Sequence, residues 1–288
     1  DNPDTPTTAG GYAIVDEDQL SGGAHDDNVK VHGTTTASGQ VNVDFGGDGA
    51  GAFGFTGITE GAPVTLVGGG ALKTDDGTAV VFHIENKGGH EIVTGMAGNV
   101  EVFKLDLNTD LTSADIGKWT FTLEQPVSHP IAGSEDDLLA SFGIQVTDGD
   151  GSQATGAIKI DINDDSPVAH DDADVVDNTT NTATGNVVTG KDTTDPVAGK
   201  DVSGADSPVH VIAVNGAAAG AGGGFTAVGQ FGTLVMDDQG QYTYTRKDGS
   251  PDNSSESFTY TIVDKDGDTS TATLTVGVND KIPTIHVP

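Results

Sequence analysis

The chain has 288 residues and a formal net charge of −32, because 44 acidic residues face only 12 Lys and Arg. This charge excludes nucleic acid as a partner, since few cations are available to neutralise phosphates, and it disfavours an anionic membrane surface for the same reason. The sequence has no cysteine for disulfides or thiolate chemistry, and no apolar run long enough for membrane insertion.

The acidic residues are biased towards aspartate, with 36 Asp against 8 Glu. Asp favours turns over helices and is a preferred oxygen ligand in calcium loops. Together with 42 glycines, this bias disfavours helices. The chain opens on Asp1-Asn2-Pro3-Asp4 without a signal-peptide pattern, so we expect a segment of a longer protein or a protein exported without a cleaved leader.

Apolar and polar residues alternate with a period of two along most of the chain, which predicts half-buried antiparallel strands separated by Gly, Asp and Asn turns. In chain order, the clearest expected strands are 41–45, 119–123, 158–162, 242–244, 258–262 and 274–278. Two short stretches, 113–116 and 134–140, are compatible with helical turns. The pattern therefore predicts an all-β chain of sandwiches with one face of each sheet buried.

The sequence contains an internal repeat. Residues 142–167 align with 258–283 at an offset of 116 without a gap, and residues 117–122 align with 240–245 at an offset of 123. The difference predicts a seven-residue insertion around 134–140. We expect two tandem modules joined by a short acidic linker. The expected divisions are 1–6 (end of a preceding linker), 7–164 (a long acidic module), 165–280 (a second module) and 281–288 (start of a following module).

Motifs in both modules are similar to those of known repeat families. The first module carries DEDQL, VDFG, TFTL, HP and VTDGDG, at residues 16–20, 43–46, 120–123, 129–130 and 146–151. It resembles the long acidic repeat of type I-secreted RTX agglutinins. The second module carries GNVV, FGTL, GQYTY and SFTYT, at residues 185–188, 231–234, 240–244 and 257–261. It is similar to VCBS or bacterial cadherin-like repeats.

These resemblances imply Ig/cadherin-like antiparallel β-sandwich modules within a giant adhesin on the surface of a Gram-negative bacterium, active in attachment or biofilm formation. They also imply export by a C-terminal signal that this sequence does not contain. Two regions depart from the families: residues 60–100 match poorly, and residues 215–224 form an unusual Gly/Ala-rich loop.

The strongest chemical motif is the acidic turn Asp264, Asp266 and Asp268, which has a counterpart at Asp148 and Asp150. Alternate Asp side chains on a turn can direct their oxygens at one centre, and calcium takes six to eight oxygen ligands. The turn is not an EF-hand, because no Glu follows at the twelfth position. A calcium site and a plain acidic hairpin turn both remain open.

A second acidic motif lies in the linker and resembles the cadherin pattern, in which such residues ligate calcium between domains. Its residues are Asp161, Asn163, Asp164 and Asp165, closely followed by Asp171 and Asp172. Asn279 and Asp280 form a weaker copy before Lys281. A solvated linker is the alternative. The turn Asp16-Glu17-Asp18 is compatible with either reading, whereas Asp26-Asp27, Asp75-Asp76, Asp136-Asp137 and Asp237-Asp238 are read as ordinary turns.

The spacing of these motifs along the chain predicts how they are shared. A strand over 153–162 spans roughly 33 Å, so the turn before it and the Asn-Asp pair after it must lie at opposite ends of a module. Stacked modules would then pair the linker of one with the acidic turn of the next. We therefore expect an inter-module calcium site that joins Asn163 and Asp164 to Asp264 and Asp266, with Asp165 and Asp268 as further candidate ligands. Asp148 and Asp150 would serve an earlier junction.

No enzyme motif emerges, because the eight His residues are scattered and neither a nucleophile elbow nor a phosphate-binding loop is present. Trp119 occupies the repeat position of Tyr242 and is expected in the core. We expect a monomeric, calcium-stiffened spacer, whose partners are the neighbouring repeats and, through other domains, a host or surface ligand. The alternative is a calcium-dependent module that binds a glycan or peptide through residues 60–100 or 215–224.

Overall fold

A computed structural model describes residues 11–24, 34–133, 136–177, 179–194, 199–220 and 222–278. The chain divides into two compact units, Asp1–Asp165 and Ser166–Pro288, and each is described by itself. Both units are built from β-strands, so the expected all-β class is confirmed. Within those ranges, the helices are two short 3-10 turns, η1 (Glu17–Gln19) and η2 (Gly46–Asp48), and no helix is long and apolar enough to cross a membrane.

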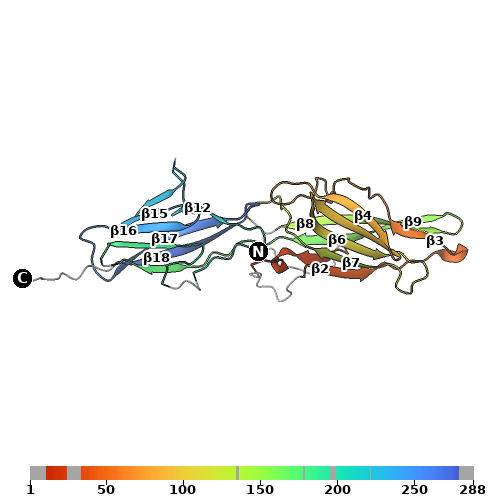
Figure 1. Ribbon diagram of the computed structural model, residues 1–288, viewed down its shortest axis with the longest axis horizontal. Helices are drawn as coiled ribbons and strands as arrows, with labels where there is room; N and C mark the ends of the chain where they lie inside the picture. The colour runs from red at the N-terminus through yellow and green to blue at the C-terminus, as the bar shows by residue number, and fades with distance from the viewer. Residues whose placement is uncertain are drawn as a thin grey trace, which may run out of the picture. The chain divides into compact units, whose positions relative to one another are not determined.

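Unit 1 consists of two sheets around a common core (Figure 1). The first sheet has the order β1-β9-β8-β3, formed by Ala13–Asp16, Gln153–Asn163, Asp137–Asp148 and Ala50–Phe55. The second has the order β2-β7-β6-β5-β4, formed by Thr36–Gln40, Lys118–Leu123, Val100–Asn108, His90–Ala97 and Val81–Lys87. The rings of Phe103, Phe121 and Phe142 meet in the core with centroids 5.2–6.1 Å apart.

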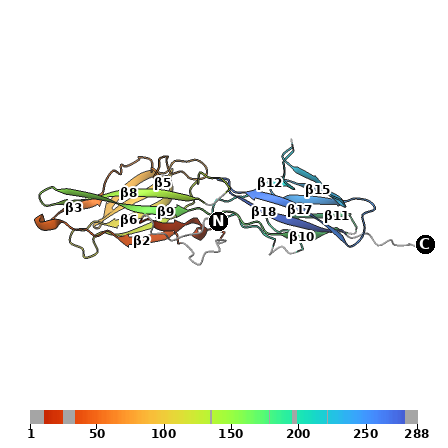
Figure 2. The same cartoon turned by 180° about the vertical axis from the view of Figure 1, so that it is seen from behind.

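Unit 2 repeats this arrangement. Its first sheet has the order β10-β18-β17-β12-β13, formed by Asp172–Val175, Thr269–Val278, Ser254–Val263, His210–Val214 and Ala217–Ala218. Its second has the order β11-β16-β15-β14, formed by Thr182–Asn186, Gln241–Arg246, Gly232–Met236 and Phe225–Val228. The long hairpin β17–β18 is visible from behind in Figure 2. Tyr242, Tyr244, Phe258 and Tyr260 fill the core.

The first strand of each unit pairs in parallel with its last strand, β1 with β9 and β10 with β18. The remaining ladders between the described strands are antiparallel, as expected. The parallel pair at one edge of each unit is an exception that the expectation of antiparallel sandwiches did not include. The chain enters a unit at one end and leaves it at the other, so its first and last strands run in the same direction.

Five of the six expected strands are confirmed, but residues 41–45 lie beyond β2 in irregular structure. The expected helical turn at 134–140 is wrong for residues 137–140, which begin β8. Leu138 and Ala140 face the core opposite Ile162 and Ile160, and this burial outweighs the local preference. The stretch 113–116 forms a hydrogen-bonded turn.

The structure extends the repeat to two glycines. Trp119 lies opposite Gly39 in unit 1, and Tyr242 lies opposite Gly185 in unit 2. A Cβ atom added at Gly39 would lie 2.6 Å from the Trp119 ring, and one added at Gly185 would lie 2.7 Å from the Tyr242 hydroxyl oxygen. Glycine is needed at both positions because an aromatic side chain covers its backbone. Trp119 packs against the core cluster, although it is only partly buried.

Candidate metal centres

Unit 1 brings three titratable side chains together at the end from which the chain leaves. Because β1 and β9 are parallel and Asp16 lies opposite Asn163, the residues that follow each strand, Glu17 and Asp164, meet at this end. The connection between β7 and β8 adds His129. Its Nε2 lies 3.6 Å from Glu17 Oε1, and its Nδ1 lies 3.7 Å from Asp164 Oδ2. One ligand atom from each residue lies within 4.8 Å of the others, a spacing that a metal ion could bridge.

This group is buried. Glu17 is fully buried, and Asp164 and His129 are at most 5% exposed. Glu17 Oε1 accepts a hydrogen bond from the Val127 N–H at 2.9 Å, whereas Oε2 is buried with no hydrogen-bond partner. Burial raises the pKa of Glu17 to about 7, although His129 and the Val127 N–H act in the opposite direction. An ionised Glu17 therefore needs a cation beside it.

The neighbouring linker residues of unit 1 are buried too. Asp165 is 1% exposed, and its carboxylate accepts a hydrogen bond from the Ala24 N–H at 3.1 Å. Asp16 and Asp18 are buried at the same end, whereas Asp161 and Asn163 are partly buried on β9. These positions differ from a solvated linker or a solvated turn, the two alternatives that the sequence left open.

The acidic turn of unit 2 is also largely buried. Asp264 is 5% exposed and Asp268 is 1% exposed, while Asp266 is partly buried. Asp264 Oδ1 accepts hydrogen bonds from the Gly267 and Asp268 N–H groups at 3.0 and 2.7 Å, and Oδ2 is buried without a hydrogen-bond partner. Burial, reinforced by Asp266, raises the pKa of Asp264 to about 8 against the effect of the Gly267 N–H. A plain hairpin turn would leave these carboxylates in water.

Asp206, from the connection between β11 and β12, adds to the acidic character of this turn. Its side chain is fully buried, and its carbonyl oxygen accepts a hydrogen bond from the Lys265 N–H at 3.2 Å. The turn therefore offers oxygen ligands from two segments of unit 2. Asp206 is separated by more than 50 residues from the motif, so the sequence pattern gave no reason to include it.

The counterpart in unit 1 has a different environment. Asp148 is partly buried and Asp150 is exposed, and Asp48 from η2 completes a group whose ligand atoms lie within 4.8 Å of one another. Hydrogen bonds with Asp148 and Ser152 lower the pKa of the Asp150 carboxyl. Asp48 and Asp150 are exposed to solvent, so this group does not need a cation to offset burial. The β8–β9 ladder separates it from Asn163, as expected, because Thr147 pairs with Gln153 and Asp137 pairs with Asn163.

Two further predicted ligands of unit 2, Asp171 and Asp172, differ in their exposure to solvent. Asp171 is exposed and accepts a hydrogen bond from the Thr273 N–H at 2.8 Å. Asp172 is buried, and burial together with the charge of Asp201 raises its pKa to about 8.

Asn279 and Asp280 lie outside the described residues, as do Asp26 and Asp27. The hypothesis that one ion joins the linker to the turn of the following module concerns both units and stays a prediction.

The sequence motifs did not indicate several residues that lie at these candidate metal centres. Asp48, His129, Asp201 and Asp206 lie in connections far in the chain from the motifs that they meet. Asp75, read as part of an ordinary turn, is close enough to raise the pKa of Glu17 further. Only His129-Pro130 carried a sequence clue, as part of the agglutinin pattern.

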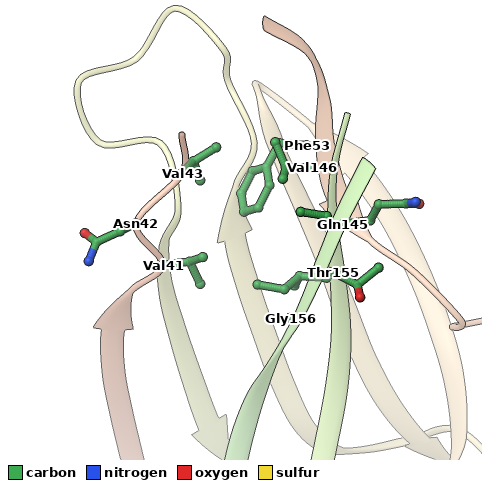
Figure 3. A pocket seen from close by; sticks show the side chains of 10 residues that line it. Val41, Asn42, Val43, Phe53, Gln145, Val146, Thr155 and Gly156 are labelled. Carbon is green, nitrogen blue, oxygen red and sulfur yellow. The ribbon is translucent and has the colours of Figure 1, made fainter. Parts of the chain in front are cut away.

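The regions considered for ligand binding offer little support for that function. Phe82 is the only aromatic residue between 60 and 100, and its ring packs 6.4 Å from that of Phe142; residues 215–224 contain none. A cleft of about 200 Å³ opens beside the irregular segment 41–45. Figure 3 shows Val41 and Val43 pointing into this cleft and Asn42 pointing away. It is mainly apolar and smaller than most small-molecule sites.

Comparison with known families gives a match for the second unit. Residues 163–277 match the model of the bacterial Ig domain family. The match covers less than half of the chain and spans every strand of unit 2 from β10 to β17 and nearly all of β18. No curated protein matches the sequence.

Solved structures with similarity to this chain include cadherins. A structure of mouse cadherin-23 EC22-24 is 15% identical over 65% of this chain and 56% of that chain, with a TM-score of 0.27. Protocadherin gamma B2 extracellular cadherin domains 1-5 are 13% identical over 82% and 42%, with a TM-score of 0.28. The bradyzoite-specific antigen BSR4 of Toxoplasma gondii is 11% identical over 84% and 86%, with a TM-score of 0.31. The chain spans about half the length of these cadherin structures.

Proposed function

We propose that this chain is a calcium-stiffened spacer segment of a large bacterial surface adhesin, which holds binding domains away from the cell. The observation that carries the proposal is the burial of acidic residues at the ends of the units. Glu17, Asp164 and Asp165 are buried where the chain leaves unit 1, and Asp264 and Asp268 are buried where it enters unit 2. Such burial is costly unless the charges are paired or bound to cations.

Calcium is the cation that these residues fit best. The turn of unit 2 offers carboxylate and carbonyl oxygens, the ligands of a hard cation. In unit 1, Glu17 and Asp164 are the expected oxygen ligands, and His129 lies beside them as a neighbour whose protonation would compete with the ion. Each bound calcium removes two negative charges from a chain of net charge −32, which reduces self-repulsion and favours the folded state by mass action.

The proposed role is mechanical, not catalytic. The bacterial Ig domain match of unit 2 supports an extracellular repeat, and the agglutinin-like motifs of unit 1 support export by the type I pathway. Neighbouring repeats of the same protein are then the direct partners, and any host or surface ligand is bound by other domains.

Calorimetric titration of calcium into the 288-residue chain, with bound ions counted by equilibrium dialysis, tests this proposal. We expect saturable binding of several ions and a large rise in melting temperature over the EDTA-treated protein. Absence of both binding heat and a melting shift would contradict it. A glycan array and a peptide panel, screened in calcium, test the ligand-binding alternative.

A further inference from the structure

A second group of buried carboxylates lies within unit 2. Asp172 begins β10 and is 3% exposed, and Asp201 lies in the connection between β11 and β12 and is 5% exposed. Each has one carboxylate oxygen, Oδ1 of Asp172 and Oδ2 of Asp201, that is buried without a hydrogen-bond partner. An unsatisfied buried carboxylate oxygen carries a large desolvation cost, so two of them in one group call for a bound cation or a bound proton.

The other oxygens of the group surround a single hydroxyl. The Tyr260 hydroxyl oxygen lies 2.8 Å from the His170 carbonyl oxygen, 3.2 Å from Asp172 Oδ2 and 3.0 Å from Asp201 Oδ1. A phenol has one proton and can donate it to only one of these three acceptors. The His170 N–H donates to Asp201 Oδ1 at 2.8 Å. Two donors therefore serve a group with two carboxylates and a carbonyl.

The charges that act on Asp172 are those of Asp201, Asp171 and Asp174, and all three disfavour its ionisation. A buried site screens charge poorly, so these carboxylates repel one another strongly when no cation is bound.

The backbone holds this group in place. Asp172 pairs with Leu274 at the start of the β10–β18 ladder. The Asp201 N–H donates to the Val188 carbonyl at 3.1 Å, and Val202 forms an antiparallel bridge with Val168. Tyr260 lies in the central strand β17. Three segments far apart in the sequence therefore present their oxygens at fixed positions, as a preformed cation site requires.

We propose that unit 2 binds a calcium ion inside its own fold, held by Asp172, Asp201 and the His170 carbonyl and bordered by the Tyr260 hydroxyl. The donors are all oxygens, which favours a hard divalent cation, and calcium tolerates their irregular arrangement better than magnesium does. This site lies within one unit and does not depend on the spacer function. Its role would be to fasten β10 and the β11–β12 connection to β17.

The repeat provides an internal comparison. The offset of 116 aligns Tyr260 with Ile144, and the β1–β9 register places Gly11 at the position of Asp172. Unit 1 therefore has neither the hydroxyl nor the first carboxylate. The proposal predicts one such internal ion per chain, in unit 2 only.

The test compares Asp201→Asn with Asp248→Asn in the 288-residue chain. Both substitutions remove one negative charge from unit 2, but Asp248 is exposed in the turn between β16 and β17. By equilibrium dialysis against calcium, Asp201→Asn should bind one ion fewer per chain than wild type, and Asp248→Asn should bind the wild-type number. Loss of the linker ions would leave this difference unchanged, so the two proposals are tested separately.

Terbium luminescence gives a second measurement on a variant that keeps both carboxylates. Terbium replaces calcium, and tyrosine excitation sensitises its emission at short range. Tyr260→Phe should retain the wild-type number of ions but lose a large part of the sensitised emission, whereas Tyr12→Phe, in unit 1, should not.

A shared proton between Asp172 and Asp201 is the competing explanation. In that case Asp201→Asn would bind as many ions as wild type, and its melting temperature would exceed that of wild type equally in EDTA and in calcium. Either an unchanged ion count in Asp201→Asn or unchanged terbium emission in Tyr260→Phe overturns the proposal.

Discussion

Replacing Glu17 by Gln should reverse its effect on stability between calcium and EDTA. Gln has nearly the same shape and keeps the oxygen that accepts the Val127 N–H, but it carries no charge. In EDTA the substitution removes a buried carboxylate, whose burial outweighs the opposing effect of His129, and should stabilise unit 1. In calcium it removes an expected ligand and should reduce the stabilisation that the ion provides.

The magnitude follows from the raised pKa of Glu17, from 4.5 to about 7. The ion-free folded state holds this proton more tightly than the unfolded chain does, so its stability falls as the pH rises from 4.5 to about 7 and then levels off. A shift of this size corresponds to about 3 kcal/mol above pH 7. In EDTA, Glu17→Gln should therefore exceed wild type by up to about 3 kcal/mol at pH 8 and equal it at pH 4.

Urea unfolding followed by tryptophan fluorescence is the suitable assay, because Trp119 is the only tryptophan and lies in unit 1. Glu124→Gln is the control, since Glu124 is exposed in the same unit. Equal destabilisation of Glu17→Gln at pH 8 in EDTA and in calcium would refute the reasoning. It would show that the Glu17 carboxylate does not act through a bound ion.

Four further outcomes are expected. EDTA should lower the melting temperature, since loss of an ion present at 100 times its Kd removes about 2.7 kcal/mol of stabilisation; differential scanning calorimetry measures this, and an unchanged transition would count against bound calcium. Asp266→Ala should broaden the distribution of conformations in solution scattering while circular dichroism stays unchanged, whereas Asp248→Ala should alter neither; equal scattering from both would contradict the junction hypothesis. Phe121→Ala should cost about 3–5 kcal/mol in the Trp119 assay, because the ring is fully buried between Phe103 and Phe142. Hydrolysis of ester, glycoside and peptide substrates should stay at background, and a turnover abolished by a single substitution would overturn the spacer proposal.

Strand positions could be predicted where side-chain alternation matches burial on one face of a sheet. Residues 158–162 and 274–278 alternate clearly, and both lie in long strands whose apolar residues are buried. Residues 41–45 alternate equally well but form no strand, because the ladder between β2 and β7 ends where Gln40 pairs with Lys118. Alternation reports which residues can face a core, but pairing requires a neighbouring strand in register.

The sequence by itself determined the chemistry of the candidate centres: an excess of Asp over Glu, grouped in turns and linkers, with no cysteine and few cations. It could not determine which carboxylates lose contact with water. Asp148 and Asp264 occupy equivalent repeat positions, yet only Asp264 is buried, beside Asp206. Likewise, Glu17 meets His129 and Asp172 meets Asp201 only because the parallel edge strands and long connections bring them together. Burial depends on residues distant in the chain, and the cost of an unpaired charge depends on burial, so only the tertiary structure decided where a cation is needed.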